Sequence, residues 1–161
     1  NAELMYGKLA ELIKPEGAYL RKSTNTSAVL HEIAENIHKR SLVIIFSDMI
    51  DNEKTDELFS ALQHLRYNKH EVILFHVTDH LLEREFKFSN RPHKFVDLET
   101  GQSVKFNPWE IKNQYISTVS SYFDDLKVKC GQYQIDLAEA DINKDFKDVL
   151  FSFLVKRKKL Y

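Results

Sequence analysis

Ser47 and Asp48 place a hydroxyl and a carboxylate directly after residues 42–46, a run of five apolar residues. Three residues of that run are β-branched, which is typical of a strand buried on both faces of a parallel sheet. In open α/β sheets, ligands bind beyond the carboxyl ends of the strands. The pattern therefore predicts a binding position at Ser47 and Asp48. Alternatively, both residues only end the strand, because Ser and Asp are ordinary turn and cap residues.

Other combinations of reactive side chains do not form a recognisable site. His76 and His80 are four residues apart but straddle a strand end, and a zinc ion needs about four ligands. The chain contains neither a Gly-x-Gly-x-x-Gly motif nor a phosphate-binding loop. Ser47 lacks the context of a nucleophile elbow. We therefore expect no catalytic residue, and we interpret His70 and His76 as residues at the rim of a strand.

The composition is that of one globular domain, which we predict over residues 1–161. With 23 basic and 24 acidic residues, the net charge of −1 gives no general attraction to nucleic acid. The single cysteine, Cys130, cannot form an internal disulfide, which suits a reducing cytoplasm. No apolar run approaches the roughly 20 residues of a membrane span. We therefore expect a cytoplasmic protein without a nucleic-acid partner.

The hydrophobic periodicity predicts an α/β fold with a parallel sheet flanked by helices. The strand–helix–strand unit between residues 42 and 77 should have a right-handed crossover. Phe46 should be fully buried between helices on both faces of the sheet. Helices are expected over residues 3–13, 24–40, 56–66, 107–129 and 146–156, and strands over residues 42–46, 71–77 and 133–139.

Residues 84–106 show a different pattern, in which polar and apolar residues alternate over 84–88, 94–98 and 103–106. A turn at residues 99–101 separates the last two segments. We predict an antiparallel hairpin insertion here, half exposed at the edge of the parallel sheet.

Five segments in this order resemble a bacterial domain-of-unknown-function family with a von Willebrand factor type A-like domain. Its members are commonly encoded beside MoxR-type AAA ATPases. The resemblance implies a Rossmann-like parallel sheet flanked by helices. The segments are residues 30–35 (LHEIAE), 41–48 (SLVIIFSD), 62–66 (LQHLR), 70–77 (HEVILFHV) and 95–101 (FVDLETG).

The resemblance also implies a metal-ion-dependent adhesion site, which usually holds Mg²⁺. Its ligands come from an Asp-x-Ser-x-Ser motif, a later Thr and an Asp after the fourth strand. Asp48 matches that Asp, with Ser47 beside it, and Thr24 matches the Thr best, with Thr26 as the second choice. The Asp-x-Ser-x-Ser motif is absent, and residues 117–121 (STVSS) lack its Asp. We therefore expect Mg²⁺ in the intact protein and none bound by this chain alone.

This reasoning predicts a protein–protein interaction module. In the intact protein it would grip an acidic side chain of its partner through the metal and work with a MoxR-type AAA ATPase or its client. Two alternatives stay open: a metal-free scaffold domain, and a Mg²⁺-dependent hydrolase that uses Asp48.

The chain starts at Asn1-Ala2 without an initiator Met, so we expect a fragment that lacks the first strands of the domain. A strand over residues 42–46 would then lie at an open edge, and such edges recruit another strand. We predict a homodimer that forms through residues 42–46 or by exchange of the helix over residues 3–13. The alternative is that this helix covers the edge within one chain.

Overall fold

A computed structural model describes residues 2–13, 26–49, 55–97 and 101–158. Thr24 lies outside these ranges. The elements are α1 (Ala2–Ile13), α2 (Thr26–Asn36), β1 (Leu42–Ser47), α3 (Thr55–Tyr67), β2 (Glu71–Thr78), a π-helical turn (His80–Arg84), β3 (His93–Val96), β4 (Ser103–Phe106), α4 (Pro108–Gln132), β5 (Asp136–Asp141) and α5 (Phe146–Lys158).

The chain divides into two compact units. One contains Asn1–Thr24 and Lys94–Phe106, and the other contains Asn25–His93 and Asn107–Tyr161. We call the second the sheet unit, because it holds β1, β2, β5 and four of the helices. None of the described helices combines the length and the apolarity that a membrane crossing requires.

The sheet unit is built on three parallel strands in the order β1-β2-β5. Val43 pairs with Val72 and Phe46 with Phe75, and Phe75 pairs in turn with Ala138. The predicted strand–helix–strand unit is confirmed as β1-α3-β2. The third strand starts at Asp136 rather than at residue 133, because Tyr133 still donates its N–H to the Lys129 carbonyl at the end of α4.

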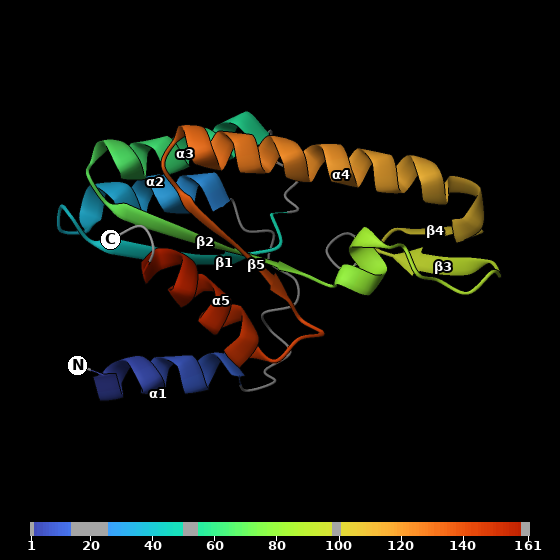
Figure 1. Cartoon of the computed structure of the whole chain (residues 1–161), viewed down its shortest axis with the longest axis horizontal. Coiled ribbons are helices and arrows are strands. Elements are labelled where there is room, and N and C mark those ends of the chain that lie inside the picture. The colour runs from blue at the N-terminus through green and yellow to red at the C-terminus, as the bar shows by residue number, and fades with distance from the viewer. Residues whose placement is uncertain (1, 14–25, 50–54, 98–100, 159–161) are drawn as a thin grey trace. The chain divides into compact units, whose positions relative to one another are not determined.

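The two faces of this sheet are covered to different extents. In Figure 1, α2, α3 and α4 lie on one face and α5 lies on the other. The core occupies the first face. It is formed by buried apolar side chains of α2, α3, α4 and β2, and Val43 and Ile45 of β1 pack against it. On the second face, the ring of Phe153 in α5 lies 5.3 Å from that of Phe75 in β2.

The prediction that Phe46 is fully buried is wrong. Leu42, Ile44 and Phe46 lie on the second face of β1 and are 50%, 49% and 68% exposed. Phe46 stacks on Phe75 with ring centroids 4.9 Å apart, but α5 packs mainly against β5. A short apolar run indicates a strand but does not reveal whether helices cover both of its faces.

Only part of the predicted insertion is a hairpin. The strands over residues 94–98 and 103–106 are confirmed as β3 and β4, whose Phe95 and Phe106 rings stack 4.5 Å apart. Their predicted place at the edge of the parallel sheet is wrong, because they form a two-stranded sheet of their own. The strand over residues 84–88 is wrong, because the chain leaves β2 through the π-helical turn. Phe86 then adopts a left-handed φ of 48° and buries its ring 4.2 Å from that of Tyr115.

Candidate functional site

Three carboxylates stand where the parallel strands end: Asp48 after β1, Asp79 after β2, and Asp141 as the last residue of β5. Because the strands are parallel, all three belong to the carboxyl edge of the sheet. Asp48 was predicted from the sequence. Asp79 and Asp141 were missed, although Asp79 follows its strand as Asp48 does and Asp141 ends its strand.

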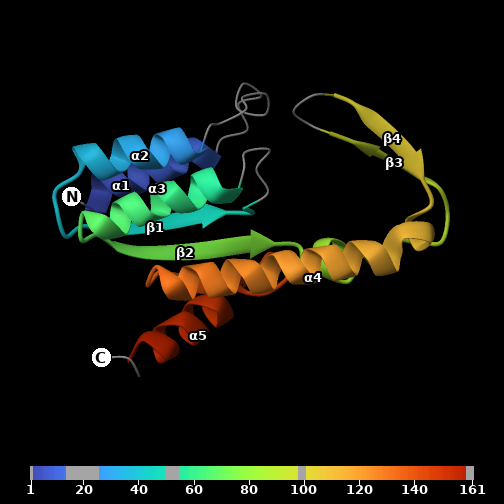
Figure 2. The ribbon, with the colours of Figure 1, turned by 90° about the horizontal axis from the view of Figure 1, so that it is seen from above.

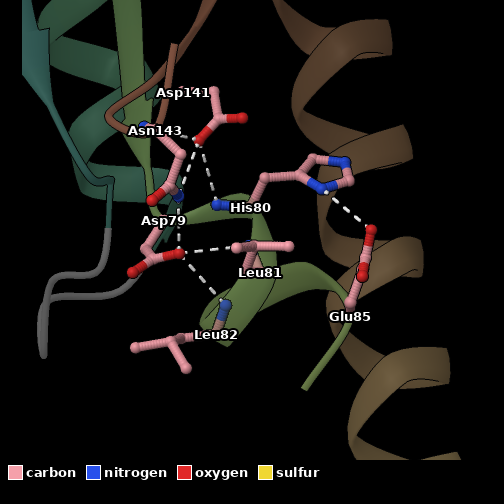
Figure 3. A network of polar contacts seen from close by, with 7 residues as sticks. All are labelled: Asp79, His80, Leu81, Leu82, Glu85, Asp141 and Asn143. Atoms are coloured by element: carbon pink, nitrogen blue, oxygen red, sulfur yellow. Dashed lines mark hydrogen bonds and ion pairs between the residues drawn. The ribbon is translucent and has the colours of Figure 1, made fainter. Parts of the chain in front are cut away.

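Asp79 and Asp141 hold the ends of β2 and β5 together (Figure 3). Asp79 Oδ1 accepts the backbone N–H groups of Leu81 and Leu82, both at 3.1 Å. Asp141 Oδ1 accepts the N–H of His80 at 3.3 Å, and Asn143 Nδ2 donates to both carboxylates at 2.9 and 3.1 Å. These carboxylates fix the backbone of the turn that follows β2.

Asp141 is ionised more easily than an ordinary aspartate. Desolvation by itself would raise the pKa of Asp141. The hydrogen bonds from Asn143 and His80 outweigh it and hold the pKa below its usual range. Asp141 therefore accepts these hydrogen bonds as a carboxylate at neutral pH.

The backbone after β1 is held by a separate set of hydrogen bonds. Ser47 Oγ accepts the N–H of Met49 at 3.0 Å, and His76 Nε2 donates to the Asp48 carbonyl at 2.9 Å. The Tyr122 hydroxyl donates to the Met49 carbonyl at 2.6 Å. Met49 itself is buried at a left-handed φ of 57°, a conformation that costs a bulky residue about 1–3 kcal/mol. These bonds fix the direction in which Asp48 leaves the sheet.

His76 is an interior residue and not the rim residue predicted from the sequence. It is almost completely buried, and its ring meets Phe123 edge-on at 4.5 Å. Burial lowers the pKa of His76, the hydrogen bond to Asp48 raises it, and the nearby charge of Arg84 lowers it further. The net effect favours a neutral ring whose Nε2–H reaches the Asp48 carbonyl. His70, which directly precedes β2, does lie at the end of that strand, and its side chain is fully buried.

The Asp48 side chain is exposed and has other acidic groups nearby. Burial is the main reason why the pKa of Glu83 is raised, and the charges of Asp48 and Asp79 add to the effect. Burial also raises the pKa of Tyr122, again with a contribution from Asp48. A cation bound near Asp48 would relieve this repulsion.

The donors near Asp48 do not by themselves fit a complete Mg²⁺ site. Mg²⁺ requires octahedral oxygen coordination, and the Ser47 hydroxyl already accepts a backbone N–H. Thr26 is the half-buried first residue of α2, which starts at the carboxyl end of β1 (Figures 1 and 2). Among the described residues, no three His, Cys, Asp or Glu side chains are grouped to hold a metal. Asp48 could contribute one carboxylate ligand.

A second candidate site is apolar and lies on the opposite face of the sheet from α2. It consists of Leu42, Ile44 and Phe46 of β1 with Phe146 and Leu150 of α5, all exposed, and we call it the β1–α5 face. A cavity of about 460 Å³ opens between Phe46, the ends of β2 and β5, and the first turns of α5. Its walls are mostly apolar, with Asp141 and Lys144 as its charged lining residues.

Comparison with known protein families, with characterised proteins and with solved structures gives no significant match to this chain.

Proposed function

We propose that the chain is a protein–protein interaction module whose binding surface is the β1–α5 face. The observation that supports this most strongly is the exposure of Phe46 and Phe146, each about two-thirds exposed. Together these two side chains leave roughly 250 Å² of aromatic surface in contact with water. Leu42, Ile44 and Leu150 extend this exposed apolar surface, and contiguous apolar patches of larger size mark interaction sites.

The resemblance to the type A-like family adds a second contact and a partner to this proposal. Asp48 would supply one ligand of an adhesion-type Mg²⁺ site in the intact protein. The partner would be a MoxR-type AAA ATPase or its client. The alternative of a metal-free scaffold keeps the β1–α5 face as the binding surface and omits the metal.

The hydrolase alternative has less support. A hydrolase needs a base or nucleophile and a charge stabiliser that converge on the substrate. Asp79 and Asp141, the other two carboxylates of the edge, are held by backbone N–H groups. Their role in fixing the turn after β2 supports a structural function for them.

The test is binding of the purified chain to a purified MoxR-type AAA ATPase from the same organism, measured by calorimetry. Phe146→Glu places a charge on the β1–α5 face at the start of α5, where an acidic residue suits the helix dipole. It should weaken binding about tenfold or more. Val128→Glu, an exposed apolar position on α4, is the matched control and should leave binding unchanged. Equal binding by both variants would contradict the assignment of the face, and no binding by the unmodified chain would contradict the partner.

A further inference from the structure

We infer that β1 pairs antiparallel with β1 of a second copy of this chain, with Ile44 on the two-fold axis. The two three-stranded sheets then join into one sheet of six strands. The inference rests on the proposed interaction function and names a second copy as the protein that binds at β1.

The backbone of β1 has unpaired groups on its outer side. The Ser41 carbonyl accepts the N–H of Glu71, so the backbone groups of Ser41 face β2. Successive residues of a strand direct these groups to alternate sides, so Val43 and Ile45 also face β2. The N–H and C=O groups of Leu42, Ile44 and Phe46 therefore face away from β2. Within the described residues no strand lies on that side, because β1 ends the order β1-β2-β5.

The exposed side chains belong to the same three residues. Leu42, Ile44 and Phe46 combine outward backbone groups with apolar side chains on the face that α5 leaves open. Residues 41–47 include no charged residue, and charges are the usual protection of an edge strand against pairing. β1 therefore has both the hydrogen-bonding groups and the apolar side chains that a strand–strand interface uses.

The alternation of β1 sets the register of the pair. Directly opposite residues of an antiparallel pair project to the same face of the sheet. Centring on Ile44 puts Leu42 opposite Phe46 of the second copy, and Val43 opposite its Ile45. All three residues with outward backbone groups then pair, and the apolar row continues across both copies. A slip of the register by one residue would place exposed residues such as Ile44 opposite Val43 or Ile45, which pack against the helices. The apolar rows of the two copies would then lie on opposite faces of the sheet, which is unfavourable.

Charge complementarity supports this register and a second copy as the occupant. With Ile44 on the axis, the turn before β1, where Arg40 has a left-handed φ of 65°, comes beside the end of β1 of the second copy, where Asp48 lies. The two-fold axis repeats this approach of opposite charges. Both residues are exposed, and Arg40 takes part in no ion pair with the described residues. A shift of the register by two residues would bring this turn beside Phe46 instead of Asp48. The opposite charges at the two ends of β1 thus suit a copy of β1 itself.

The test is the dissociation constant of the purified chain, measured by analytical ultracentrifugation at micromolar concentrations. The unmodified chain should sediment as a dimer of twice 18.9 kDa. Asp48→Arg sets Arg40 against a second cation and should weaken the dimer about tenfold. The double variant Arg40→Asp/Asp48→Arg restores opposite charges and should recover the original constant to within about threefold. A double variant as weak as the single one would overturn the proposed register.

Ile44→Pro tests whether the backbone edge takes part. It removes an N–H that faces away from β2, so the monomer should still fold, as circular dichroism can check, but the dimer should be lost. Ile45→Pro removes an N–H that faces β2 and should instead unfold the chain.

Three results would overturn the inference: a monomer at all concentrations, a dimer that resists both Asp48→Arg and Ile44→Pro, and a dimer lost only on Leu9→Lys. The last would indicate exchange of α1, where Leu9 is exposed. These outcomes concern dimerisation only. The proposed function is tested separately, by the effect of Phe146→Glu on ATPase binding.

Discussion

The two edge strands of the same parallel sheet differ in how they are protected. Three of the six residues of β5 are acidic, namely Asp136, Glu139 and Asp141, whereas β1 contains no charged residue. On one side of β5, Glu139 forms ion pairs with Lys127 at 3.0 Å and Arg84 at 3.5 Å. On the other side, Asp136 lies 4.0 Å from Arg157 of α5. Both α4 and α5 pack against β5, whereas the described helices of the sheet unit cover one face of β1.

The difference shows which edge is suited to association. Charges on an edge strand oppose pairing, because a second strand would have to desolvate them. The ion pairs of β5 also lower the cost of keeping Glu139 ionised. Burial alone would raise the pKa of Glu139, but the hydrogen bond from Lys127 and the charge of Arg84 hold it below the usual range. β1 has no such protection, which is why we assign association to β1.

The largest expected difference within the sheet lies between Leu74 and Phe46. Leu74 is fully buried in β2, so Leu74→Ala should lower the free energy of unfolding by about 2–5 kcal/mol. Phe46→Ala should lower it by less than about 1 kcal/mol, because most of that side chain is exposed in the monomer. Urea denaturation at a concentration that favours monomers measures both. Equal costs would contradict the description of β1 as an uncovered edge.

Tyr122→Phe should have a smaller effect, confined to the end of β1. It removes the hydroxyl that donates to the Met49 carbonyl and should cost about 0.5–1.5 kcal/mol. Hydrogen exchange of the Met49 N–H, which Ser47 accepts, should also become faster. Tyr133→Phe, at the C-terminal cap of the same helix but without this bond, is the control. Unchanged exchange in Tyr122→Phe would show that the loop is held by other contacts.

His76 should make stability fall as the pH falls through the range below about 6.5. The pKa of His76 is lowered in the folded state, so the unfolded chain binds the proton more readily. The neutral His76 ring contributes its full stabilisation at a pH above the pKa of this residue in the unfolded chain. That contribution is lost as the pH falls toward the lower pKa of the folded chain. His76→Gln retains an N–H donor toward Asp48 but does not titrate, so its unfolding free energy should depend less on pH between 6.5 and 5. An identical slope in both proteins would rule out His76 as the source.

Salt should have the smallest effect, and it should act on association rather than on folding. Screening of the Arg40–Asp48 pairs should weaken the dimer about threefold between low and 0.5 M NaCl. Asp48→Asn should remove most of this dependence while leaving Phe46 and Ile44 in place. A strong salt dependence that persists in Asp48→Asn would assign the effect to other charges.

Local patterns were enough to predict much of the fold. The helix predicted to begin at residue 107 is confirmed as α4, and the Asn107 side chain caps it by accepting the N–H of Trp109. Helix caps and hydrophobic periods act over a few residues, so a sequence reveals them directly. The three parallel strands were predicted from the hydrophobic pattern and are confirmed. Their predicted boundaries differ from the observed ones by up to three residues.

The contacts of the candidate sites could not be predicted in the same way. Burial of His76 depends on Phe123, which is 47 positions away in the chain, and the exposure of Phe46 depends on where α5 packs. The π-helical turn depends on Asp79, Asp141 and Asn143 meeting at the ends of two strands. Such features are set by tertiary packing and leave no local period in the sequence.

The most direct test of the pairing of β1 is disulfide formation by Ile44→Cys. In the proposed register the two Ile44 residues are opposite each other, with Cα atoms about 5.5 Å apart, within the range that a disulfide spans. The native Cys130 should not interfere, because it is buried and burial raises the pKa of its thiol to about 11. Under mild oxidation, Ile44→Cys should form a covalent dimer quickly, while Val128→Cys on α4 should not. Equal, slow cross-linking of both variants would contradict the account.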